Sequence, residues 1–219
     1  MPIPMAGALC RAPSGVQGVI SGVVRNARGE VCLMSCSHVL ASSSTPSVTD
    51  VIEWWDPGGQ PPAWQRAGTL WKWVRFTGGG ACNNLDVALA VLNPELAATF
   101  DGMPPLEIAP YDLKYRGAPM AKFNTRSGRW QDGRIQNLFV DESLPFDAFG
   151  ADSFNLCGLI QSQVPNSPGD SGAIVLVQDG PLGIHIAGDT VGTGWAIPLE
   201  RAFDAWGLQM VDFATPGDS

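Results

Sequence analysis

Short apolar runs alternate with polar, glycine-rich turns along the whole chain, a pattern typical of β-structure. In the first half this pattern predicts a hairpin over residues 17–41 with Gly29 in its turn, and further strands at 51–55 and 69–76. In the second half it predicts a series of strands at 119–124, 133–139, 156–162, 173–178, 182–188 and 194–198. The chain is therefore expected to be built mainly of short strands.

Helical periodicity is convincing in one segment only, residues 201–206. Leu199, Ala202, Phe203 and Trp206 would share one face of this helix, and the glycine that follows would end it. Composition agrees with this picture, because 26 glycines and 18 prolines accompany a charged fraction of only 16%. The 219 residues would form an all-β fold, either as one large domain or as two small subdomains.

Charge and cysteine content restrict the possible partners of the protein and the compartment in which it is expected. A net charge of −8 argues against nucleic acid or an anionic membrane as partner, and no apolar run is long enough to span a bilayer. Residues 1–5 lack the basic start and apolar core of a secretory signal. Five cysteines leave at least one unpaired, and Cys32 and Cys36 flank a strand too short to fold back and join them. These features predict a reduced, cytoplasmic protein.

Ser171 lies in a glycine-rich turn between Gly169 and Gly172. Glycines let a tight turn aim several backbone N–H groups at one point, as a developing oxyanion requires. A serine hydroxyl needs a base to become a good nucleophile, and the chain has two histidines, His38 and His185. His38 follows the apolar run 31–36, which predicts that a buried strand delivers it at its end.

Asp86 stands at the start of the apolar run 87–92 and is the candidate for an acid that orients the imidazole. The order along the chain is therefore His38, Asp86, Ser171. An α/β-hydrolase would instead have Gly-x-Ser-x-Gly and a histidine well downstream. Ala173 replaces the second glycine, and His185 follows the serine too closely, so this alternative is rejected.

These segments resemble the trypsin-like serine peptidases of the chymotrypsin fold, in their bacterial form. Residues 169–172 read Gly-Asp-Ser-Gly, as in that family, and residues 36–38 read Cys-Ser-His where the family usually has Ala-Ala-His. Residues 86–89 match the family pattern of aspartate, hydrophobic residue, alanine and leucine. The similarity extends to three further segments and so covers most of the chain: 122–135, 183–188 and 194–198.

The resemblance implies two six-stranded antiparallel β-barrels and a short C-terminal helix. Residues 1–105 would form the first barrel, with His38 and Asp86. A linker over 106–118 would lead to the second barrel, residues 119–198, which carries Ser171. Residues 199–219 would form the helix and the tail.

The resemblance also implies a serine endopeptidase that acts on a protein or peptide substrate and needs no cofactor or metal. Ser171 would be the nucleophile, His38 the proton acceptor and donor, and Asp86 the group that orients the imidazole. The N–H groups of Gly169 and Ser171 would form the oxyanion hole. Asp170 would be structural. In secreted relatives the matching aspartate binds a new N-terminal ammonium, but this chain lacks the Ile-Val-Gly-Gly start, so another donor is expected.

Specificity would depend on the strand 185–188, which is expected to run beside the substrate with Gly188 leaving room for it. His185 resembles the pocket histidine of glutamyl endopeptidases and viral 3C-like cysteine peptidases, which cut after Glu or Gln. An imidazole at this place can donate a hydrogen bond to the side-chain oxygen of a Glu or Gln in the substrate. Pro165 stands where the trypsin pocket has its acid, so Lys or Arg is not expected. Asn166 would add a second polar contact and Trp195 would line the pocket. The alternative is that His185 is a buried strand residue without a role in specificity.

Two other functions stay open on the sequence alone. One is a non-catalytic peptide-binding module on a peptidase fold, which would not explain why His38, Asp86 and Ser171 are all present. The other is a processing peptidase held in check for one partner substrate. A regulatory protein partner would suit the predicted cytoplasmic location, because an unrestrained protease would damage its host. Hydrolysis of an unstructured protein such as casein separates the first alternative from an active peptidase.

Overall fold

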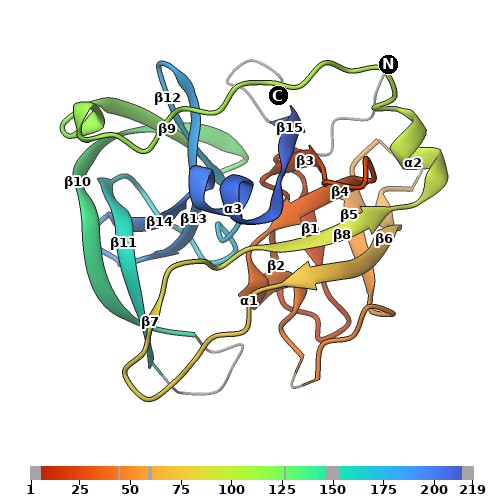
Figure 1. Ribbon diagram of the computed structural model, residues 1–219, viewed down its shortest axis with the longest axis horizontal. Coiled ribbons are helices and arrows are strands. Elements are labelled where there is room, and N and C mark those ends of the chain that lie inside the picture. The colour runs from red at the N-terminus through yellow and green to blue at the C-terminus, as the bar shows by residue number, and fades with distance from the viewer. Residues whose placement is uncertain (1–5, 44, 59–60, 126, 147–152, 214–219) are drawn as a thin grey trace.

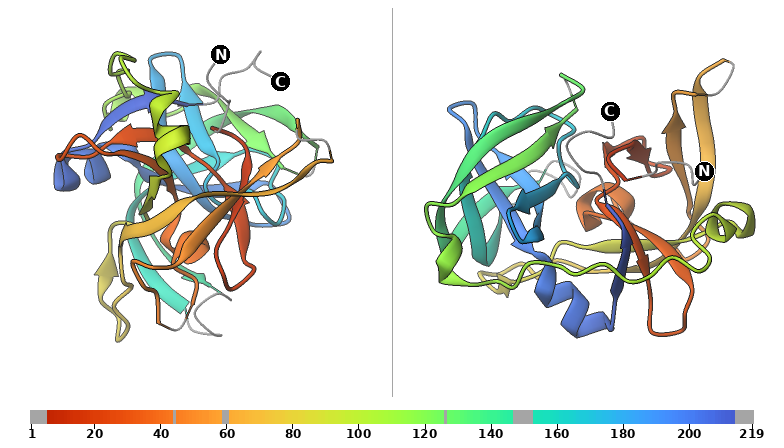
Figure 2. Two further views of the ribbon diagram at one scale, coloured as in Figure 1. Left: turned by 90° about the vertical axis from the view of Figure 1, so that its right-hand side faces the viewer. Right: turned by 90° about the horizontal axis from the view of Figure 1, so that it is seen from above.

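The computed structural model describes residues 6–43, 45–58, 61–125, 127–146 and 153–213, which form two curled, mostly antiparallel sheets (Figure 1). Figure 2 shows the two resulting barrels side by side. The predicted all-β architecture is confirmed.

The first barrel is closed by residues 17–25, a continuous segment that contains the first and the last strand of the ring. Its strands follow the order β3 (Gly22–Arg25), β4 (Val31–Ser35), β8 (Ala88–Leu92), β6 (Ala63–Trp73), β5 (Val51–Asp56), β1 (Leu9–Arg11) and β2 (Gln17–Val19). β2 runs directly toward β3, and the Ser21 N–H between them donates to the Met34 carbonyl at 2.8 Å. With β2 and β3 taken as one strand, the ring of described residues has the six strands that were predicted.

The second barrel is closed by pairing between its two longest strands. Its order is β10 (Arg129–Pro145), β9 (Pro119–Asn124), β12 (Ile174–Val177), β13 (Gly180–Gly188), β14 (Thr193–Pro198) and β11 (Ser153–Gln163). β10 also pairs with β11, with several register shifts along the ladder. Such shifts bend a strand, as closure of a small barrel requires.

Each half of the chain also contributes a strand to the sheet of the other half. β7 (Cys82–Asn83) pairs in parallel with β11, and β15 (Gln209–Asp212) pairs with β3. The segment predicted as a linker carries a short 3-10 helix, η1 (Leu113–Tyr115), and its Leu106 bridges to Met210. The proposed domain boundaries stay a prediction, with β7 and β15 lying across them.

The C-terminal helix α3 (Leu199–Trp206) forms as predicted and ends at Gly207, whose φ of 61° is the left-handed conformation that glycine favours. Two short helices were not predicted, α1 (Ser37–Leu40) and α2 (Pro94–Ala98). A proline at the first turn was the missed signal for α2.

The prediction that His38 ends a strand is wrong. β4 stops at Ser35, and His38 lies in α1. Ser37 accounts for the difference, because its hydroxyl donates to the Val87 carbonyl at 2.6 Å and accepts from the Val74 N–H at 3.0 Å. These bonds turn the chain out of the sheet.

A disulfide joins Cys82 of β7 to Cys157 of β11. The expectation of fully reduced cysteines is wrong for this pair. The two cysteines are 75 residues apart, and nothing in the sequence indicates that β7 and β11 meet. Cys10, Cys32 and Cys36 are free and buried, so the absence of a Cys32–Cys36 bridge is confirmed. Disulfides are typical of oxidising compartments, so the pair weighs against the cytoplasmic location, which stays a prediction.

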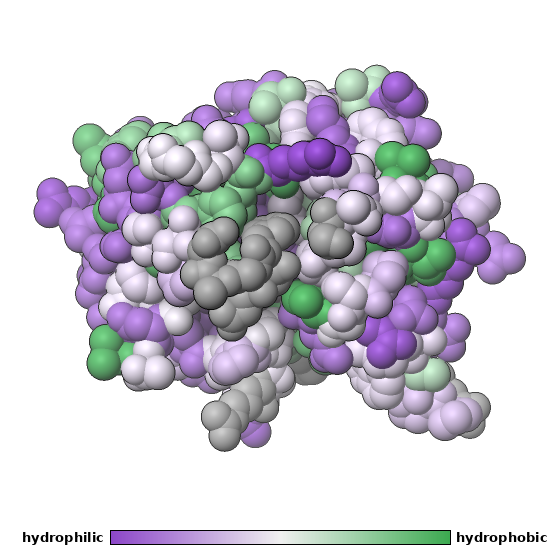
Figure 3. Space-filling view, turned by 90° about the horizontal axis from the view of Figure 1, so that it is seen from below, coloured by the Kyte–Doolittle hydropathy of each residue, from purple (hydrophilic) through white to green (hydrophobic). Residues whose placement is uncertain are grey.

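The core is shared between the barrels. Its larger cluster contains Leu33 and Leu89 of the first barrel together with Leu159 and Ile184 of the second. On the face seen in Figure 3, hydrophobic and hydrophilic residues intermingle instead of gathering into one patch. No helix within the described ranges is long and apolar enough to cross a membrane.

Candidate active site

His38 and Asp86 form a buried pair at the edge of the first barrel. The His38 Nδ1 and the Asp86 Oδ2 lie 2.5 Å apart, and the backbone N–H of His38 donates to Asp86 Oδ1 at 3.1 Å. Asp86 is completely buried and His38 is 7% exposed. A carboxylate without a proton only accepts hydrogen bonds, so this contact suits the tautomer with its proton on Nδ1, in which Nε2 can accept a proton. This is the tautomer that a general base needs.

Two further side chains enclose this pair. The ring of Phe146, which follows β10, lies 4.9 Å from the His38 ring centroid. The ligand atoms of Cys36, His38 and Asp86 lie within 4.8 Å of one another, a combination of types that can bind a metal and that sequence spacing did not reveal. Burial, however, raises the pKa of the Cys36 thiol well above its ordinary value. The thiolate that a metal requires is therefore disfavoured at neutral pH.

The turn that carries Ser171 requires its two glycines. Gly169 has a φ of 92° and Gly172 a φ of 95°, values that side chains rarely allow. A Cβ on Gly172 would also overlap the Val19 carbonyl oxygen of the first barrel. The Val19 N–H in turn donates to the Ser171 carbonyl at 2.7 Å. The turn is thus pressed against the first barrel, and Gly172 makes that approach possible.

The serine turn and the histidine helix meet at one backbone oxygen, the carbonyl of His185. It accepts from the Gly172 N–H at 2.8 Å and from the Cys36 thiol at 3.4 Å. The Ser171 hydroxyl donates to the Ile186 carbonyl at 3.2 Å, and no hydrogen bond joins it to His38 among the described residues. Catalytic hydrogen bonds are often long or misaligned without substrate, and a rotation of the Ser171 side chain would redirect the hydroxyl.

The backbone N–H groups of Gly169 and Ser171 have no protein acceptor among the described residues. Their neighbours are engaged, since Asp170 donates to Ser167 O at 3.1 Å and Gly172 to His185 O. Two free donors on alternate residues of a glycine turn are what an oxyanion hole requires. Their aim at a substrate oxygen stays a prediction.

Asp170 does find another donor, as expected. Its Oδ2 accepts from the Lys122 Nζ at 2.6 Å, and both groups are buried. The carboxylate also accepts hydrogen bonds from the last residue of β9, from the residue after it and from the serine turn: Asn124 Nδ2, Thr125 N, Thr125 Oγ1 and Ser167 N. Burial lowers the pKa of Lys122, an effect that Asp170 opposes. The pair anchors the serine turn to β9.

Replacing Lys122 with Met is expected to lower the free energy of unfolding by about 3–5 kcal/mol, because it leaves the Asp170 charge buried without its cation. Chemical denaturation measures the change. Adding Asp170→Asn should restore part of the loss, since the buried group is then neutral. Lys114→Met is the matched control, because Lys114 pairs with Asp179 at the surface and should matter much less. Equal losses in both lysine variants would contradict this role.

Two of the residues predicted to set specificity, Asn166 and His185, lie close to Gly194 of β14, together with Ser162, which sequence reasoning missed. A Cβ on Gly194 would lie 3.0 Å from Ser162 Oγ, 3.1 Å from Asn166 Oδ1 and 3.3 Å from His185 Cε1. Gly188 is paired with Gly194 across the β13–β14 ladder. Burial holds the pKa of His185 well below its ordinary value, with Lys122 and His38 adding to the effect, so its ring is neutral at pH 7.

Pro165 and Asn166 line a cavity of about 460 Å³, together with residues that include Asp189 and Gly192. Trp195 is half-buried against the larger core cluster, and its indole N–H is buried with no partner in the described part of the chain. Its contact with a substrate stays a prediction.

No protein-family model matches the chain, and no curated protein matches it either. Solved structures do match it over nearly their whole length. They include Cellulomonas bogoriensis chymotrypsin, with 19% identity, a TM-score of 0.60 and coverage of 94% of this chain and 97% of that one. A Nocardiopsis protease has 17% identity, a TM-score of 0.62 and coverage of 95% and 99%. A glutamic acid specific serine protease, described as using a histidine triad in substrate binding, has 15% identity, a TM-score of 0.61 and coverage of 94% and 98%.

The chain has the chymotrypsin fold. At these identities the likeness shows the fold alone, so the roles of individual residues depend on the geometry above. Within this chymotrypsin fold, sequence reasoning missed Cys36, Lys122 and Phe146 as neighbours of the site. Lys122 had a signal, because it stands two residues after the apolar Met120 and therefore shares the inward face of β9.

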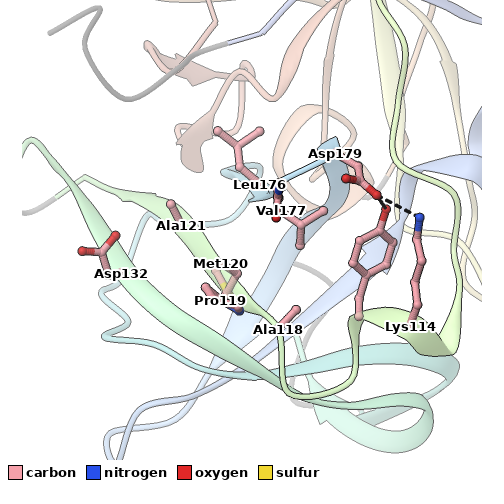
Figure 4. Close-up of a pocket in the computed structure, with 11 residues that line it drawn as sticks. Lys114, Ala118, Pro119, Met120, Ala121, Asp132, Leu176, Val177 and Asp179 are labelled. Atoms are coloured by element: carbon pink, nitrogen blue, oxygen red, sulfur yellow. Dashed lines mark hydrogen bonds and ion pairs between the residues drawn. The ribbon is translucent and has the colours of Figure 1, made fainter.

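A second cavity of about 580 Å³ lies on the second barrel of this chymotrypsin fold, over β9, β12 and η1 (Figure 4). At its rim Asp179 accepts from Lys114 Nζ at 2.8 Å and from Tyr115 Oη at 2.6 Å. It shares no lining residue with the predicted active site.

Proposed function

We propose that this protein is a serine endopeptidase that hydrolyses peptide bonds through His38, Asp86 and Ser171. The observation that carries the proposal is the buried His38–Asp86 pair, in which one carboxylate holds both the ring and the backbone of the histidine. A structural histidine alone would not explain the partly exposed serine turn, which shares the His185 carbonyl with Cys36 and has two N–H groups without an acceptor among the described residues.

In the first step His38 Nε2 takes the Ser171 proton while Oγ attacks the substrate carbonyl carbon. The N–H groups of Gly169 and Ser171 receive the negative charge that forms on the carbonyl oxygen. The imidazolium then gives its proton to the leaving amine, and the C–N bond breaks to leave an acyl-enzyme. Water then attacks the ester carbonyl carbon while His38 takes one of its protons. The imidazolium gives that proton to Ser171 Oγ as the ester C–O bond breaks and the acid leaves. Asp86 stabilises the imidazolium throughout.

The finer part of the proposal concerns the residue before the scissile bond. A neutral His185 ring can donate one hydrogen bond to a Glu or Gln oxygen, and Ser162 and Asn166 add polar groups beside it. The glutamic acid specific neighbour uses a histidine triad in substrate binding. This chain has two histidines in all and would bind the substrate side chain with fewer histidines. We propose that the groups around His185 have the chemistry to recognise Glu or Gln wherever a substrate side chain reaches them.

Labelling with a fluorophosphonate tests the proposal, because the nucleophile displaces fluoride from phosphorus and keeps the phosphonyl group. Mass spectrometry is expected to find the adduct on Ser171 and nowhere else, and casein is expected to be cleaved. Labelling without casein cleavage would favour the processing peptidase with a single partner substrate. Absence of both would favour a peptide-binding module and end the case for proteolysis.

A further inference from the structure

The space between Gly188 and Gly194 is occupied by a side chain of the protein itself. A Cβ on Gly188 would overlap Asn166 Cγ and lie 2.6 Å from both Asn166 Cβ and Nδ2. On the opposite strand, the Cβ position of Gly194 is 3.1 Å from Asn166 Oδ1. The two glycines face each other across the ladder, so the Asn166 carboxamide fills the slot that they leave.

Hydrogen bonds hold Asn166 in this slot from two sides. Its Oδ1 accepts from the Lys122 Nζ at 3.1 Å, and its Nδ2 donates to the Thr193 carbonyl at 2.9 Å. Lys122 is itself fixed by the buried carboxylate of Asp170. A substrate side chain that displaced Asn166 would therefore have to break both bonds and replace them, which costs binding energy.

Asn166 also lies between a cavity and the His185 ring. On one side it lines the 460 Å³ cavity with Pro165, and His185 is not among the described residues that line this cavity. On the other side, Asn166 Oδ1 and His185 Cε1 both lie within 3.3 Å of the Cβ position of Gly194. Shortening Asn166 would join the cavity to His185.

We propose, on the basis of the proposed peptidase function, that Asn166 is a built-in plug of the specificity pocket and Lys122 its positioning residue. The protein then accepts small residues such as Ala before the scissile bond. Recognition of Glu or Gln by His185 is latent and appears once the plug is removed.

Asn166→Ala tests the plug, with Asn166→Leu as the matched control that keeps the volume of the side chain. The probes are peptide diphenyl phosphonates that differ only in an Ala, Gln or Glu side chain at phosphorus; Ser171 displaces phenoxide and becomes phosphonylated. Wild type and Asn166→Leu should react fastest with the Ala probe. Asn166→Ala should react with the Gln and Glu probes about tenfold faster or more, because a few heavy atoms in a pocket alter rates by that much.

Two outcomes would overturn the plug. One is a wild-type protein that reacts with the Gln or Glu probe as fast as with the Ala probe. The other is an Asn166→Ala protein that is folded, by its melting curve, yet has the wild-type profile. A small fluorophosphonate without a side chain separates these outcomes from failure of the peptidase proposal, because its reaction with the wild-type protein reports Ser171 and not the pocket. If it does not label the wild-type protein, the peptidase proposal fails and the plug with it.

Discussion

Ser171→Ala is expected to lower the rate of peptide hydrolysis by a factor on the order of 10⁶ and to abolish fluorophosphonate labelling. The change removes the only atom that forms a bond to the substrate, while the oxyanion donors stay in place. Only the slow background from bound water should then remain. Steady-state hydrolysis of casein or of a cleaved peptide measures the loss.

Ser143→Ala is the control for this loss, because Ser143 is an exposed serine of β10 outside the proposed site. It should be labelled and should hydrolyse substrate as wild type does. Within the described part of the chain the Ser171 side chain makes one hydrogen bond, to the Ile186 carbonyl, so the Ser171→Ala protein should keep its melting temperature. Persisting hydrolysis in folded Ser171→Ala would mean that another residue is the nucleophile.

Asp86→Asn is expected to lower kcat by about 10⁴ with little change in structure. The amide can still fill the buried site, but its NH₂ group would face His38 Nδ1 and cannot accept a hydrogen bond from it. His38 Nδ1 would then become an acceptor and Nε2 a donor, so the ring could no longer take the Ser171 proton. Substrate binding should be almost unchanged, and KM should therefore stay near its wild-type value.

Asp112→Asn is a matched control, since the hydrogen bond that the described residues give the Asp112 side chain is from the Lys114 N–H in η1. It should leave kcat unchanged. An active Asp86→Asn protein beside an inactive Ser171→Ala protein would exclude Asp86 from the mechanism, because the tautomer would then not depend on the carboxylate.

Much of the fold was accessible from the sequence because strand patterning is local. Short apolar runs between turns located β9, β13 and β14 to within about two residues, which is the usual precision of element boundaries. Pairings between distant segments were not accessible. The β7–β11 contact and its disulfide depend on two short segments meeting across 75 residues, and neither segment is distinctive by itself.

The candidate site shows the same division. The glycine turn around Ser171 and the acid at the mouth of β8 were visible as local motifs. The interaction of Lys122 with Asp170 and the place of Asn166 in the slot were not, because each is a side-chain position set by tertiary packing. The sequence thus indicated the proposed chemistry but not the space available to a substrate.

The exchange of β7 and β15 between the sheets has a consequence for how the molecule moves. A hinge rotation that parted the barrels would have to peel β7 from β11 and β15 from β3, against their ladder hydrogen bonds and the shared core. Adjustment to a ligand is therefore left to loops and rotamers. Heating should melt both barrels in one cooperative transition, with no stable half-folded form that an isolated fragment could reproduce.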